Sequence, residues 1–200
     1  MKSKNTHAEN VAEWLPTYAE TKAVMLGYFA QLELRQAIDD AVFGRFIGTN
    51  GLQYFNDHYA FFYSLHKGEK KSDWPKYLLA AREALLQKSE QLSEASNFEA
   101  LNQLVTTTTQ HIGHLKGMFW YDCALCIGAA LGLAPEQVYI GHAGARKGAV
   151  ALWGEGRVDA LVANGPALGK HHFEEIDPIF EALTADQIET YLCAYHYRMP

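Results

Sequence analysis

The sequence predicts a mainly α-helical protein, a single-domain bundle of about seven to nine helices with at most a very short strand. Apolar residues recur at helical spacing through most of the 200 residues. Capping residues open several of these segments, and glycine or proline separates them. A chain of 200 residues also fits one sizeable core better than two, so we expect residues 1–200 to form one domain.

The first part of the chain reads as helices separated by a glycine-rich break. A short helix at Asn10–Leu15 is expected to end at Pro16, and a longer helical pattern follows over Thr17–Phe43. The segment Gly44–Gly51 interrupts this pattern. The aromatic-rich stretch Leu52–Leu65 is predicted as a helix, because its polar residues fall on a different face from its aromatic ones.

Capping signals mark the next two helices. Ser72 is expected to cap a helix that carries Pro75 in its first turn. Ser96 and Glu99 are spaced as a capping box, which predicts that the following helix starts there.

The second half contains the most hydrophobic predicted helix, which runs from Gly117 or Met118 to about Gly132. Pro135 is expected to start a single helical turn, and Val138–Ile140 is a strand-like triplet. The region 154–172 is expected to be a loop with at most one helical turn. The remaining helices are predicted at His142–Trp153, Phe173–Leu183 and Thr184–Tyr197, the last opened by a capping box of Thr184 and Gln187.

Composition and charge narrow the classes of protein. The formal net charge of −6 argues against a chain coated by nucleic acid or anionic lipid, although a local basic groove stays compatible with it. Three cysteines without disulfide-framework spacing favour a reducing compartment. The first ten residues lack a signal-peptide core, and no apolar run reaches the ~18 residues of a membrane span. We therefore expect a cytoplasmic protein without a membrane partner.

The CxxC pair Cys123 and Cys126 is the first candidate for chemistry. Together with His111 and His114 it supplies a donor set that zinc accepts in tetrahedral geometry. The pair lies inside an apolar helix, however, whereas a redox CxxC sits at an exposed helix start. Because cysteine also packs as a small hydrophobe, we expect both thiols to face the core, with no metal and no cofactor.

The glycine-rich helix start Gly141–Gly148 is the second candidate. Free amides at a helix start favour an anion, Arg146 and Lys147 add positive charge, and Lys116 is a further basic candidate. Glycines such as Gly144 let a ligand or another backbone approach closely. The alternative interpretation is that the glycines and alanines form a smooth face for helix packing, and the two are compatible.

An acidic residue in an apolar helix is the third candidate. Asp122 needs a partner or a capping role in such surroundings. It is a candidate general base, with His142 as a second catalytic candidate. A salt-bridge or helix-dipole role for Asp122 is the more ordinary interpretation.

The block Ile112–Ala149 resembles a degenerate helix-hairpin-helix segment of the kind found in base-excision DNA glycosylases. In those proteins the amides of a glycine-centred hairpin hold a DNA phosphate, and here Gly113 and Gly117 occupy the hairpin. The glycosylases also carry a catalytic aspartate near the start of the later helix. This chain has no carboxylate over residues 137–154, so the resemblance implies a DNA-binding scaffold without glycosylase activity.

The same block is similar to a bacterial family of uncharacterised proteins, which implies a bacterial protein and assigns no activity. The matching positions are Tyr121-Asp122, Ile127-Gly128, Pro135, Val138-Tyr139 and His142-Ala143-Gly144.

Three functional hypotheses follow. The first is a nucleic-acid- or phosphate-binding protein that uses Lys116, Arg146 and Lys147. The second is a protein-interaction module, such as an effector/immunity or toxin–antitoxin component, in which Leu52–Leu65 covers a protein partner. The third is an enzyme with a site around Asp122 and His142.

Overall fold

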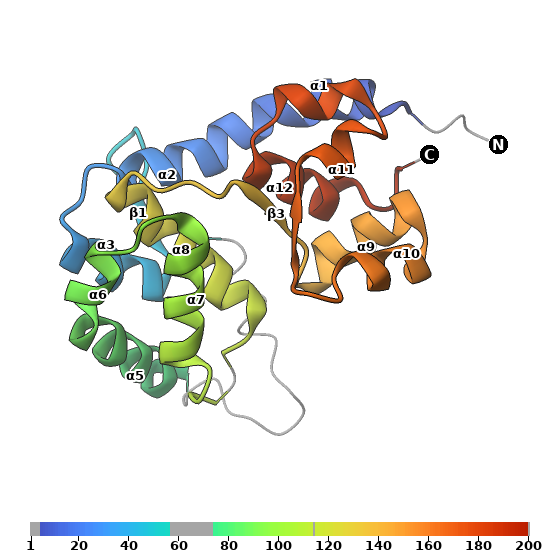
Figure 1. The fold of residues 1–200 in the computed structure, drawn as a ribbon. Coiled ribbons are helices and arrows are strands. Elements are labelled where there is room, and N and C mark those ends of the chain that lie inside the picture. Colours follow the sequence, from blue (N-terminus) through green and yellow to red (C-terminus); the bar gives the residue numbers. More distant parts are fainter. Residues whose placement is uncertain (1–4, 57–73, 114, 200) are drawn as a thin grey trace. The chain divides into compact units, whose positions relative to one another are not determined.

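The computed structural model describes residues 5–56, 74–113 and 115–199. Over these residues the protein is mainly helical, with two short antiparallel pairs of strands, which confirms the predicted fold class (Figure 1). Within the same residues, none of the helices combines the length and the apolar character that crossing a membrane requires.

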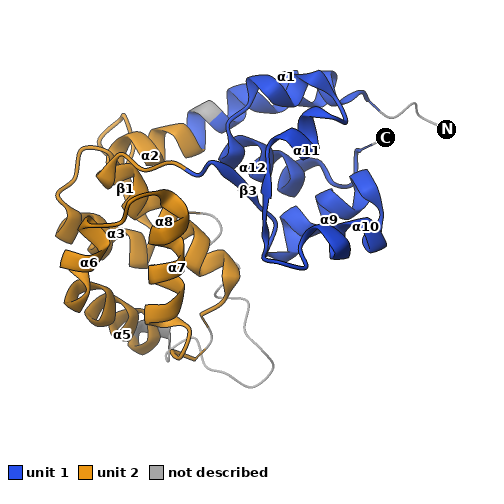
Figure 2. Ribbon diagram, viewed as in Figure 1, with its two compact units in different colours: residues 1–21, 135–200 blue, residues 22–134 orange. Residues whose placement is uncertain are grey.

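The chain divides into two compact units, shown in two colours in Figure 2. The N-terminal unit combines residues 1–21 with residues 135–200, and the central unit comprises residues 22–134. A single domain would unfold in one cooperative transition that includes both units. The expectation of one domain therefore stays a prediction.

The central unit packs around its most hydrophobic helix, α8 (Gly117–Leu131), which contacts α2, α3 and α7. Consecutive residues from Tyr121 to Gly128 are all buried, so this helix has no solvent-facing stripe over that stretch. It ends at Gly132, whose φ of 70° is left-handed and favours glycine. The other elements are α2 (Val24–Phe29), α3 (Leu34–Phe43), β1 (Arg45–Ile47), β2 (Gln53–Phe55), α5 (Trp74–Gln87), α6 (Ser89–Ser93) and α7 (Phe98–Thr109).

The N-terminal unit packs around its last helix, α12 (Ala185–Tyr195), which contacts α1, β3 and α9. The predicted capping box is confirmed: the Thr184 hydroxyl accepts from the Gln187 amide, and the Gln187 side chain accepts from the Thr184 amide. The other elements are α1 (His7–Tyr18), β3 (Gln137–Tyr139), α9 (Ala143–Trp153), α10 (Glu155–Leu161), β4 (Ala167–Gly169), α11 (His171–Glu174) and the 3-10 turn η3 (Pro178–Ala182).

The expected long helix over Thr17–Phe43 is wrong, and so is the expected stop at Pro16. Helix α1 continues through Pro16 and is followed by a π-helical turn, η1 (Ala19–Ala23). Proline removes one amide donor near the end of a helix without forcing it to stop. Glu33 has an extended backbone, with φ −66° and ψ 146°, and it separates α2 from α3.

The predicted helix over Leu52–Leu65 is also wrong at its start. Strand β2 lies there instead and pairs with β1, with Phe46 opposite Tyr54 in the register. The turn between the strands contains Gly51 at a φ of 75°, so the glycine-rich stretch forms a hairpin rather than a simple helix break. Residues 57–65 of the predicted helix lie outside the described residues.

One predicted cap is displaced. Helix α7 is capped by Asn97, whose side chain accepts from the Ala100 amide at 2.8 Å, and not by Ser96 with Glu99. Asparagine at this position offers the same acceptor one residue later, so the helix starts at Phe98. The expected cap at Ser72 falls outside the described residues.

In the second half the predicted strand is confirmed as β3, but its partner β4 lies in the region that we expected to be a loop. The same region contains helix α10 and the start of α11. The helix expected over Phe173–Leu183 is divided by Asp177, an extended residue whose side chain caps η3 through the Ile179 amide. Pro135 does not start a helical turn, since residues 133–135 have no regular structure.

We expect Gly128→Val to destabilise the central unit. A Cβ at this position would lie 2.8 Å from the carbonyl oxygen of Leu133 and 3.3 Å from the ring of Phe98. Such overpacking costs about 1–3 kcal/mol. Gly27→Val is the matched control, because nothing lies within 4 Å of its added Cβ. Urea denaturation measures the difference, and equal midpoints for the two variants would contradict the packing of α8.

A buried histidine fixes the start of α1. The Nδ1 atom of His7 lies 3.0 Å from the hydroxyl oxygen of Tyr191 on α12. Burial lowers the pKa of His7 below its ordinary value of 6.5, and the negative charge of Asp177 opposes this shift only in part. The neutral ring is therefore the form that packs in the folded chain.

This burial predicts a loss of stability in mild acid. The unfolded chain binds the His7 proton more readily than the folded chain, so stability is complete above pH 6.5 and falls as the pH drops toward the lowered folded pKa. The slope is at most about 1.4 kcal/mol per pH unit for one proton. His7→Phe should flatten this part of the stability profile, measured by urea denaturation at several pH values. The exposed His111→Phe is the control, and a profile unchanged by His7→Phe would contradict the assignment.

Candidate metal centre

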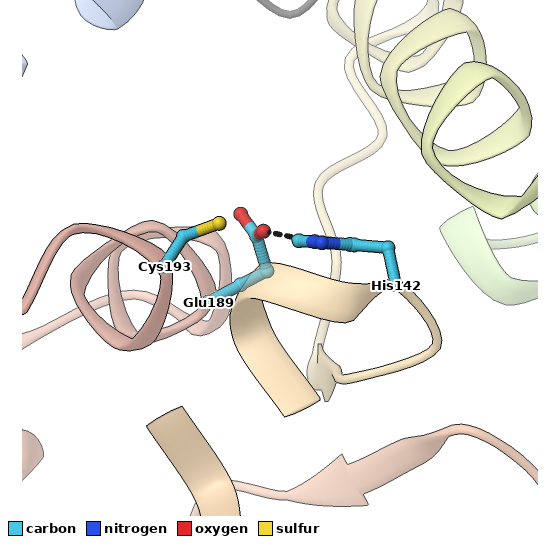
Figure 3. Close-up of side chains that lie close together, drawn as sticks. All are labelled: His142, Glu189 and Cys193. Carbon is cyan, nitrogen blue, oxygen red and sulfur yellow. Dashed lines mark hydrogen bonds and ion pairs between the residues drawn. The ribbon is translucent and has the colours of Figure 1, made fainter. Parts of the chain in front are cut away.

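Three ligand-bearing side chains gather in the N-terminal unit: His142, Glu189 and Cys193. His142 directly precedes the first residue of α9, whereas Glu189 and Cys193 lie one turn apart on α12. Figure 3 shows the sulfur of Cys193 and the imidazole of His142 directed toward the carboxylate of Glu189 from either side. The cluster therefore joins the start of one helix to the middle of another.

The donor atoms converge tightly. One ligand atom from each residue lies within 4.8 Å of the other two, and the Nε2 atom of His142 is 2.5 Å from Oε1 of Glu189. The second carboxylate oxygen, Oε2, accepts from the Thr190 hydroxyl at 3.0 Å. The side chains of His142 and Glu189 are only 4% and 1% exposed, while Cys193 is partly exposed. Solvent would therefore reach a bound ion from the side of the Cys193 thiol.

The electrostatics of the cluster favour positive charge at its centre. Burial by itself lowers the pKa of His142, but its interactions with the neighbouring Cys193 and Glu189 side chains outweigh burial and raise the pKa to about 10. A buried carboxylate attracts a proton or a cation because it is expensive to leave uncompensated. Without a metal, the proton on His142 meets this need at neutral pH.

Two glycines let α9 approach α12 closely enough to form this cluster. A Cβ at Gly144 would overlap the sulfur of Cys193, and a Cβ at Gly148 would overlap the backbone of Leu192. These contacts support the interpretation that the glycines serve helix packing. The resulting close approach of α9 to α12 positions His142. The pairing of β3 with β4 also positions His142. Two residues before it, the amide of Ile140 donates to the Pro166 carbonyl at 2.7 Å.

The residues predicted to bind an anion are divided between the two units. In the N-terminal unit, Arg146 forms an ion pair with Asp159 on α10, and Lys147 is exposed. A Cβ at Gly141 would lie 2.5 Å from the end of the Tyr139 side chain and 2.9 Å from Cβ of Pro166, so a side chain here would require these neighbours to shift. Lys116 lies in the central unit, at the start of α8. Anion binding by these residues stays a prediction.

The CxxC motif behaves as predicted in one respect: Cys123 and Cys126 are both buried in the central unit. Burial, reinforced by the charge of Asp122, raises the pKa of both thiols and keeps them protonated. Of the two histidines considered with them, His111 is exposed and His114 lies outside the described residues. Asp122 itself is buried on α8, so its catalytic pairing with His142 stays a prediction.

Sequence reasoning identified His142 and missed Glu189 and Cys193. A signal was available, because Glu189 stands within the apolar stripe that α12 buries, next to Ile188 and Leu192. An acidic residue in such a stripe needs a partner, and Cys193 follows it by one helical turn. The partner, His142, is 47 residues away from Glu189 in the sequence.

The arrangement suits a metal ion better than a proton relay. A nucleophile–histidine–carboxylate relay uses both ring nitrogens, one toward each partner. Here Nε2 faces the carboxylate, whereas Nδ1 of His142 is buried without a hydrogen-bond partner among the described residues. The thiol and the carboxylate therefore do not approach the ring through opposite nitrogens, and all three donors converge instead.

No family model, curated protein or solved structure matches this chain. The interpretation of the cluster therefore rests on its geometry and chemistry.

The close approach of α9 and α12 predicts a strong effect of Gly148→Ala. The added methyl group would meet the Leu192 backbone, which cannot turn away as a side chain can. We expect a loss of about 1–3 kcal/mol in the free energy of unfolding, measured by urea denaturation. Gly156→Ala, where nothing lies within 4 Å, should be neutral or slightly stabilising. A Gly148→Ala chain as stable as wild type would show that the helices tolerate a wider separation.

Proposed function

We propose that this protein binds a divalent transition-metal ion, zinc in first place, through His142, Glu189 and Cys193. The observation that carries this proposal is the convergence of the three donor atoms within 4.8 Å of one another at a largely buried position. Side chains of these three types are the ligands that zinc takes in proteins.

The donor set favours zinc over harder cations. Calcium and magnesium take oxygen ligands almost exclusively, whereas imidazole and thiolate suit zinc and its neighbours in the first transition row. The mixture of one nitrogen, one oxygen and one sulfur donor matches the second group. A carboxylate and a thiolate also neutralise the double charge of the ion, which makes the bound state compatible with a buried position.

The position of the cluster suggests what the ion does. It would connect the start of α9 to the middle of α12, and α12 is the helix on which the N-terminal unit packs. A ligand that binds only the folded state stabilises that state. We therefore propose a metal-stabilised fold for residues 1–21 and 135–200 as the first consequence of binding.

The other hypotheses concern different surfaces and stay predictions. Nucleic-acid or phosphate binding would use Lys116, Arg146 and Lys147. A protein partner would bind the aromatic stretch Leu52–Leu65, of which Leu52 and Phe55 are each 60% exposed.

The test is metal stoichiometry and affinity. The full chain, without a histidine tag, is stripped with EDTA, and zinc uptake is measured by elemental analysis and by competition with a chromophoric chelator. We expect about one zinc ion per wild-type chain and a rise in Tm when zinc is added. His142→Ala, Glu189→Gln and Cys193→Ser should each lose the bound ion and the rise in Tm.

Matched substitutions at exposed positions control for nonspecific binding. His111→Ala and Glu181→Gln remove the same ligand types from the surface and should bind zinc as wild type does. A wild-type chain that takes up no zinc, cobalt or nickel would overturn the proposal. So would uptake that the three cluster variants retain.

A further inference from the structure

We infer that His196 supplies a fourth protein ligand to this ion and closes the site. The inference rests on the proposed function, because it concerns the same ion. It assigns a residue that lies outside the cluster of three and decides whether the ion is structural or open to a substrate.

The position of His196 on α12 puts it on the ligand face. Glu189, Cys193 and His196 stand at helical positions i, i+4 and i+7, which share one face. Regular α12 ends at Tyr195, but His196 keeps a helical backbone, with φ −53° and ψ −26°, so the same periodicity applies to it. Its side chain therefore starts one turn beyond Cys193 on that face.

The hydrogen bond of His196 leaves its Nε2 atom able to bind a metal ion. Its Nδ1 atom lies 3.0 Å from the backbone carbonyl oxygen of Cys193. A carbonyl oxygen can only accept, so Nδ1 carries the proton and Nε2 of the neutral ring keeps its lone pair. Metal-binding histidines commonly show this arrangement, with the other ring nitrogen donating to a carbonyl group.

The Nε2 atom of His196 is also buried. It has no hydrogen-bond partner among the residues that the structure describes. A buried polar atom of this kind calls for a partner such as an ion. Nε2 is not among the donor atoms that already converge, so binding requires His196 to move toward the ion while its Nδ1 atom keeps donating to the Cys193 carbonyl.

A fourth protein ligand has a chemical consequence. Zinc sites with three protein ligands keep a position for water or substrate, whereas sites with four are closed and stabilise the fold. With His196 bound, the ion has two imidazoles, one carboxylate and one thiolate around it. The structure then points to a structural zinc site rather than a hydrolytic one.

Cobalt titration tests the inference. Co²⁺ replaces zinc and reports its coordination by visible absorption, which is strong in tetrahedral sites and weaker when water raises the coordination number. Wild type should show the strong absorption together with a thiolate charge-transfer band. His196→Ala should keep the charge-transfer band, lose visible intensity and bind at least about tenfold more weakly. His172→Ala, in the same unit, is the control.

Free imidazole provides a readout that a merely structural role would not move. Added to the cobalt-loaded His196→Ala chain, it should fill the vacant position and restore the wild-type spectrum. The wild-type chain gives a second measurement that needs no variant: in a chain labelled with ¹⁵N-histidine, zinc should shift the Nε2 resonances of both His142 and His196.

The outcomes separate the two proposals. A wild-type chain that binds no cobalt overturns the proposed function and this inference together. A wild-type chain that binds cobalt, with His196→Ala unchanged in spectrum and affinity, overturns only the role of His196. A His196 Nε2 resonance that stays in place while that of His142 shifts also overturns this role, even if the variant does not fold.

Discussion

The close approach of α9 and α12 is the constraint on which the N-terminal unit and its candidate site depend. It exists because Gly144 and Gly148 have no side chain where Cys193 and Leu192 lie. The same approach brings Nε2 of His142 to 2.5 Å from Oε1 of the buried Glu189 carboxylate. The same two glycines thus allow the helices to pack closely and bring His142 beside Glu189. A side chain at either position is expected to disturb both the packing and the cluster.

The two units show that burial alone does not give a thiol its chemistry. Cys123 and Cys126 are buried among apolar side chains beside a carboxylate, so they stay protonated and serve as packing groups. Cys193 is partly exposed, and its sulfur lies close to the carboxylate of Glu189 and the ring of His142. A CxxC spacing by itself says nothing about the charges around its thiols.

Buried polar groups are satisfied in different ways along α12. Asp186 accepts from the Tyr18 hydroxyl at 2.6 Å, and Tyr191 meets His7 at 3.0 Å, so both have partners within the unit. Nδ1 of His142 and Nε2 of His196 have no such partner among the described residues. Of these two, only Nε2 of His196 is an atom that we propose binds the ion, because His142 would bind it through Nε2, the atom that faces Glu189.

The sequence by itself determined the elements that depend on local interactions. The apolar run of α8 and the capping box of Thr184 and Gln187 need only near neighbours, and both were predicted correctly. The hairpin of β1 and β2 was missed, because aromatic residues at short spacing suit a strand as well as a helix. Tertiary structure alone decided the site: residues 47 positions apart meet only after two helices have packed through their glycines, and no local pattern encodes that contact.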